Sequence, residues 1–108
     1  MKLSIKVESF APRCKNTLRG FCLVRIEELH LLVYDVAVHT KNGKTWAQLP
    51  KRPWIKDGHT VVDDDGNPKY FPILGFTNTA VGDAFSAAAV KALLERDPHA
   101  LECRGAVQ

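Results

Sequence analysis

Residues 30–49 read HLLVYDVAVHTKNGKTWAQL, and this stretch decides the expected fold. Residues 30–39 are rich in Leu, Val and Tyr on both alternating faces, which predicts a central strand. Asn42-Gly43 tolerates positive φ at both central positions of a type I′ turn, so a hairpin is expected there. Residues 45–49 form the returning strand. Pro50 and Pro53 end it, because proline cannot donate to a ladder.

Two further strands are expected before this hairpin. Residues 3–9 alternate apolar and polar side chains, which predicts a strand with one solvated face. Residues 11–17 contain Pro12 and several polar side chains, and they predict a loop. Residues 18–26 predict a second strand in which Gly20 marks a bulge. The pair Glu27-Glu28 then makes a tight connection to the central strand.

After the hairpin, the pattern predicts an arm and a helix. Residues 59–62 and 70–74 flank an Asp-Gly turn at residues 63–67, which indicates a hairpin arm. From Thr79 apolar residues recur at helical spacing, Asn78 or Thr79 can cap the start, and Pro98 ends the helix. The expected fold is α+β: a four- to five-stranded antiparallel meander followed by one C-terminal amphipathic helix. Residues 1–97 form one domain, and residues 98–108 form a mobile tail.

Composition narrows the class of protein. The chain has 108 residues, 45% of them hydrophobic, which suits one small domain. No stretch is long and apolar enough for a membrane helix or a secretory signal, so we expect a cytoplasmic protein without a membrane partner. Three cysteines at irregular spacing predict free thiols rather than a disulfide. The four histidines are scattered, and no metal site is expected.

The most informative segment for function is basic and carries both tryptophans. Residues 41–56 hold five of the 15 basic side chains and no acid. Cations neutralise phosphates, and aromatic rings stack on unpaired bases, so this segment predicts nucleic-acid binding. Trp46 falls in a strand and is expected in the core. The predicted binding residues are Lys41, Lys44, Lys51, Arg52, Trp54 and Lys56.

Catalysis and cofactors are not expected. The sequence has no glycine-rich phosphate loop and no nucleophile elbow, and no nucleophile has a base at a recognisable spacing. The run Asp63-Asp64-Asp65-Gly66-Asn67 lacks the alternating ligands and the distant Glu of a calcium loop. We therefore expect a non-enzymatic protein with no catalytic residue, metal or cofactor.

The order of these pieces resembles the bacterial stage V sporulation protein G (SpoVG) family. The resemblance covers about residues 1–95. It rests on the strand at residues 33–38, the Asn-Gly turn, Ala47-Gln48-Leu49-Pro50-Lys51-Arg52, an Asp57-Gly58 turn, residues 70–73 and the closing helix. Pro50-Lys51-Arg52 is its most specific piece. Three departures are the replacement of the family's Met and Ser by Leu49 and by the direct succession of Pro50 and Lys51, a longer arm at residues 56–69, and the absence of Lys and Arg from residues 79–89, where the family carries basic side chains.

The resemblance implies a SpoVG-like domain: a small homodimeric regulator that binds nucleic acid. Either DNA or RNA, single- or double-stranded, satisfies this chemistry. The alanines at 84, 87, 88 and 92 suit close helix packing in a dimer, or simple packing on the sheet. The alternative function is a protein-interaction module that captures a partner through its sheet edge or its arm.

Overall fold

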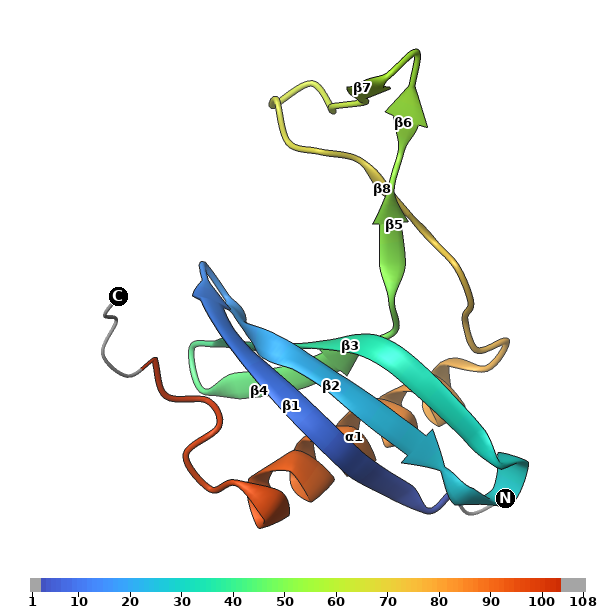
Figure 1. The fold of residues 1–108 in the computed structure, drawn as a ribbon, viewed down its shortest axis with the longest axis vertical. Coiled ribbons are helices and arrows are strands. Elements are labelled where there is room, and N and C mark those ends of the chain that lie inside the picture. The colour runs from blue at the N-terminus through green and yellow to red at the C-terminus, as the bar shows by residue number, and fades with distance from the viewer. Residues whose placement is uncertain (1–2, 104–108) are drawn as a thin grey trace.

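The computed structural model describes residues 3–103. They form an antiparallel sheet with a helix against one face and an arm that projects from it (Figure 1). The strand order in the sheet is β1-β2-β3-β4, and the α-helix follows the strands. The predicted α+β class is therefore confirmed. The sheet strands are β1 (Ile5–Lys15), β2 (Leu18–Ile26), β3 (Leu31–Lys41) and β4 (Lys44–Gln48), with a short 3-10 helix at Glu27–Leu29 between β2 and β3.

The β3–β4 hairpin has the predicted turn. Lys41 pairs with Lys44, and the φ angles of Asn42 and Gly43 are 52° and 79°. Both values are positive, as a type I′ turn requires. The central position of β3, between β2 and β4, is also confirmed.

Only one face of β3 is covered, although the sequence predicted apolar contacts on both. Val33, Val36 and Val38 are buried, whereas Leu32 is 41% exposed and Tyr34 is 61% exposed. The reason is that the helix packs on one side of the sheet only, against β1 and β4. We call the uncovered side the open face.

The first strand is longer than predicted, because the expected loop at residues 11–17 is mostly strand. β1 pairs with β2 as far as Lys15 opposite Leu18. Pro12 is tolerated because β1 is an edge strand, where a missing N–H costs no ladder bond. The predicted irregularity at Gly20 is confirmed, since the pairing of β2 with β3 shifts between Leu18 and Gly20.

Helix α1 (Thr79–Arg96) begins and ends where the sequence indicates. The Asn78 side chain accepts hydrogen bonds from the N–H groups of Ala80 and Val81, and the helix ends just before Pro98. Its buried residues follow one another at intervals of four along one stripe, which packs on the sheet; they are Phe85, Ala89 and Leu93. The Ala47 N–H donates to Ser86 Oγ at 2.8 Å and ties β4 to the helix.

The predicted arm is present, but its predicted pairing is wrong: residues 59–60 and 70–72 each pair with an earlier strand, and only an isolated bridge from Val62 to Pro68 joins the two predicted flanks. We define the arm as residues 51–72. Its base is β5 (Lys51–Pro53) paired with β8 (Tyr70–Pro72), and its far part is β6 (Ile55–Lys56) paired with β7 (His59–Thr60). The predicted turn at residues 63–67 is held by the Asp63 carboxylate, which accepts from the N–H groups of Asp65 and Asn67. Figure 1 shows the arm standing away from the sheet.

Three chain segments of the arm meet at one backbone junction. The Trp54 N–H donates to Lys69 O, the Val61 N–H donates to Trp54 O, and the Lys69 N–H donates to Val61 O. Each of the three segments is thus bonded to both others. The arm is consequently a braced structure rather than an irregular loop.

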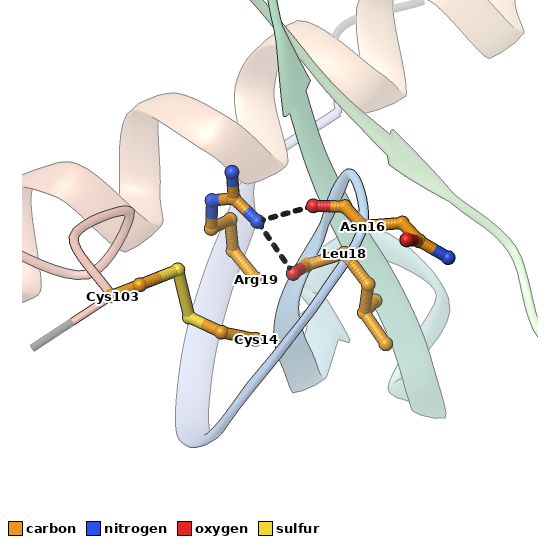
Figure 2. The surroundings of a disulfide bond; sticks show 5 residues. All are labelled: Cys14, Asn16, Leu18, Arg19 and Cys103. Carbon is orange, nitrogen blue, oxygen red and sulfur yellow. Dashed lines mark hydrogen bonds between the residues drawn. A yellow bond between two sulfur atoms is a disulfide. The ribbon is translucent and has the colours of Figure 1, made fainter. Parts of the chain in front are cut away.

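The prediction of three free cysteines is wrong for two of them. Cys14, on β1, forms a disulfide with Cys103, which follows the helix (Figure 2). The two residues are 89 positions apart in the chain, so no local spacing indicated the pair. Folding brings them together because α1 packs against β1 and returns the chain to that edge. Only Cys22 is a free thiol among residues 3–103, and it is buried.

The described residues that follow the helix, 97–103, are anchored to the body. Ala100 is buried in the core, and Cys103 is held by its disulfide. The prediction of a mobile tail did not anticipate these contacts, and residues 104–108 lie outside the described part. Within residues 3–103, no helix has the length and apolar character needed to cross a membrane.

Candidate nucleic-acid interface

The base of the arm exposes two of the predicted cations. Lys51 and Arg52 lie on β5, and both side chains are solvent-exposed. The Arg52 guanidinium carbon lies 4.6 Å from the centroid of the Phe71 ring, on the paired strand β8. This contact orients the guanidinium and leaves its N–H groups available to an anion.

Trp54 lies at the backbone junction and is 44% exposed. The Lys69 ammonium nitrogen is 5.6 Å from its ring centroid. The sequence predicted Trp54 as a binding residue, and the structure places it exposed on the braced arm. Lys56 is also exposed, farther out at the Asp57-Gly58 turn.

Lys41 and Lys44 do not join this group. They flank the β3–β4 turn, whereas Lys51 follows the opposite end of β4. A strand rises about 3.3 Å per residue, so β4 alone separates the two ends by roughly 13 Å. The predicted site is therefore two exposed basic patches, one at each end of β4, rather than one cluster.

Charge on the arm is segregated along its length. The arm has four cations and four carboxylates: Lys51, Arg52, Lys56 and Lys69 against Asp57, Asp63, Asp64 and Asp65. Three of the carboxylates belong to the turn at residues 63–67, and two of the cations belong to β5. Among residues 3–103, no ion pair engages an arm cation. The base of the arm is thus the part able to attract a polyanion.

The open face next to the arm carries two aromatic side chains that are not among the predicted binding residues. His39 on β3 and Trp46 on β4 are cross-strand partners whose rings stack with centroids 5.5 Å apart and planes 10° apart. Both are half-buried. Trp46 is therefore not a core residue as predicted, and the alternation with buried Val38 and Ala47 was the signal that both rings face the other way.

His39 sits in a positively charged setting. Its Nδ1 is 2.9 Å from Thr17 Oγ1. Burial lowers the pKa of His39 below its usual value, and the positive charges of Lys51 and Arg19 lower it further. The imidazole is accordingly biased toward its neutral form.

A pocket of about 500 Å³ lies where the open face meets the base of the arm. Its floor comes from β2, β3 and β4, and its wall comes from the arm. Its lining includes Phe21, Asp35, Ala37, Gln48, Lys51 and Tyr70.

Neither a metal site nor a known relative identifies a function for this chain. Among residues 3–103, no group of three or more His, Cys, Asp or Glu side chains is arranged to hold a metal ion. No family model, curated protein or solved structure matches this chain. The resemblance to the stage V sporulation protein G family therefore stays a prediction.

Proposed function

We propose that this chain is a small, non-enzymatic regulatory protein that binds nucleic acid through the base of its arm. The observation that carries the proposal is the exposed pair Lys51 and Arg52, which no carboxylate neutralises among the described residues. Exposed cations of this kind neutralise phosphates and release condensed counterions, which drives association.

Aromatic side chains beside these cations support the same function. The rings of Phe71 and Trp54 lie under Arg52 and Lys69. A cation above a ring presents a positive charge next to a flat apolar surface. Nucleic acids present the complementary groups, because each phosphate has a flat base nearby. Contacts to phosphates supply affinity without sequence information, so this surface alone binds mixed sequences.

The cellular setting is part of the proposal. A bacterial, cytoplasmic SpoVG-like regulator has access to nucleic acid. The Cys14–Cys103 disulfide argues against that compartment, since the cytosol keeps most thiols reduced. The redox state of Cys14 and Cys103 in the cell tests the cytoplasmic location, and it is measured by quenching cells with acid and then alkylating the free thiols. A pair that is found reduced supports the cytoplasmic location, and a pair that is found oxidised contradicts it.

The binding proposal is tested by titrating a labelled mixed-sequence oligonucleotide, single-stranded and duplex, across a salt series. Wild-type protein should bind with an affinity that falls as salt rises. The double variant Lys51→Gln with Arg52→Gln should bind more weakly, and its salt slope should be smaller by about two. Glutamine keeps most of the side-chain length, so the change is mainly one of charge.

A matched control removes one charge from the other side of the molecule. Lys91 is exposed on α1, which packs on the face opposite the pocket. Lys91→Gln should leave the affinity close to wild type, whereas Lys51→Gln alone should lower the salt slope by about one. Equal effects of these two single variants would show non-specific attraction to net charge and would contradict an arm-based site.

A second candidate function is protein binding through the arm. The observation that favours it is a set of apolar side chains on or beside the arm, each more than half exposed: Ile55, Val62, Tyr70 and Ile73. Exposed apolar groups gathered on one projecting element are typical of interaction surfaces. Absence of oligonucleotide binding even at low salt would make this the better reading.

A further inference from the structure

The open face contains a row of side chains that leaves a hollow in its middle. Phe21 on β2 is the cross-strand partner of Ala37 on β3, and Ala37 is the partner of Gln48 on β4. All three are half-buried and line the pocket at the base of the arm. A methyl group between two large side chains is what opens the space, because directly paired side chains on a sheet otherwise fill it.

Asp35 brings a carboxylate to the same pocket through an irregular backbone. Its φ is 59°, which is uncommon outside glycine, and it lies where the β2–β3 pairing shifts. Bulges of this kind change the direction of a side chain and recur beside functional sites. Asp35 is exposed and lines the pocket with Gln48, so a carboxylate and an amide are both available to a ligand there.

The wall of the pocket supplies an aromatic ring and a cation. Tyr70, 57% exposed, comes from β8, and Lys51 comes from β5. Phe21 and Tyr70 offer ring surfaces for stacking, Gln48 and Asp35 offer hydrogen-bonding groups, and Lys51 offers positive charge at the rim. This set matches an unpaired nucleotide, which has a flat base, polar edges and a phosphate.

We propose that this pocket binds one unpaired base of a single-stranded nucleic acid, with an adjacent phosphate on Lys51. The inference rests on the proposed function, and it specifies the ligand as a single-stranded nucleic acid. Asp35 accepts a hydrogen bond from the base edge, and Gln48 can both donate and accept one. A base inside a duplex cannot enter, since its faces and its pairing edge are already occupied.

The experiment compares one labelled mixed-sequence oligonucleotide as a single strand and as a duplex, by fluorescence anisotropy at constant salt. Stacking of a base contributes about 1–3 kcal/mol, so wild-type protein should bind the single strand roughly 5- to 150-fold more tightly. Ala37→Leu fills the hollow and should reduce the single-strand affinity to the duplex level, with duplex binding unchanged. Thermal unfolding of the variant reports whether it folds.

Two further variants keep the test decisive. Tyr70→Ala removes a ring from an exposed position on the arm, and it should lower the single-strand preference even if Ala37→Leu does not fold. Tyr34→Ala is the matched control, because Tyr34 lies on the same strand as Ala37 but does not line the pocket. The control should keep the wild-type preference.

The outcomes separate the two proposals. Equal binding of single strand and duplex by wild-type protein, or a single-strand preference that survives in both folded pocket variants, overturns the base pocket and leaves the proposed function standing. Absence of binding to either oligonucleotide at low salt overturns the proposed function and the base pocket together.

Discussion

At the scale of single residues, Gly20 is a position in the sheet that has no room for a side chain. A Cβ atom there would lie 2.5 Å from Ala11 O and 2.5 Å from the Phe10 ring. The Phe10 ring therefore covers the space above Gly20 that a side chain would need. Glycine at this position is required by packing rather than by a turn.

We predict that Gly20→Ala destabilises the protein by about 1–3 kcal/mol, because the added methyl forces the β1 backbone or the Phe10 ring to move. Urea unfolding measures the change. Gly75→Ala is the matched control, since a Cβ there meets nothing within 4 Å. A Gly20→Ala midpoint equal to that of wild type would contradict this account of Phe10.

The protonation of His39 makes the stability of the fold depend on pH. Its folded-state pKa is lowered by burial, Lys51 and Arg19, so in acid the unfolded chain takes up a proton more readily than the folded protein. Stability is then fully present above about pH 6.5 and is lost as the pH falls toward the lowered folded-state value. The stacked Trp46 ring and Thr17 Oγ1 complete the surroundings of the imidazole.

We predict that the free energy of unfolding falls between pH 7.5 and 5.5, and that His39→Gln reduces this fall. Urea titrations at several pH values measure it. His59→Gln provides the control, because His59 is exposed on the arm. A pH dependence that is the same in His39→Gln and in wild type would show that other groups cause it.

At the scale of elements, the disulfide joins the edge strand β1 to the segment after α1. Arg19 lies beside this joint and donates to the carbonyls of Asn16 and Leu18, each at 2.8 Å (Figure 2). The bond closes a loop of 89 residues, nearly the whole domain. In the chain-entropy model, such a loop contributes roughly 4–5 kcal/mol by restricting the unfolded chain.

We predict one titratable thiol in denatured, unreduced protein and three after reduction. Cys14→Ser with Cys103→Ser should lower the unfolding midpoint substantially, because the unfolded chain gains freedom. Cys22 should stay unreactive in the folded protein, since burial raises its pKa to about 11. Three reactive thiols before reduction would contradict the disulfide.

At the scale of the whole molecule, apolar groups are left uncovered in three places. They are the open face with Leu32 and Tyr34, the arm with Ile55 and Val62, and the outer side of α1, where Ala84 and Ala87 are exposed. Association of two chains is a common way to cover such surfaces in a domain of this size.

We predict a homodimer of about 24 kDa in sedimentation equilibrium, twice the 12.0 kDa chain mass. Ile55→Ser with Val62→Ser should favour the monomer if the arm makes the contact, and Ala87→Glu should do so if the helix makes it. A wild-type monomer at every micromolar concentration tested would exclude the dimer.

The sequence by itself determined the features that arise between residues close in the chain. Asn42-Gly43 specified its turn through permitted φ angles, alternation at residues 3–9 indicated the first strand, and Asn78 with Pro98 set the limits of α1. Of the candidate site, it identified the basic segment that contains Lys51, Arg52 and Trp54. These signals depend on local backbone geometry, which a short window of sequence contains.

Only the tertiary structure decided which distant surfaces meet. It paired Cys14 with Cys103, left the second face of β3 uncovered, and formed the pocket around Ala37. Each of these depends on where the helix and the arm pack relative to the sheet. Such placement is set by contacts between residues far apart in the chain, and no local pattern encodes it.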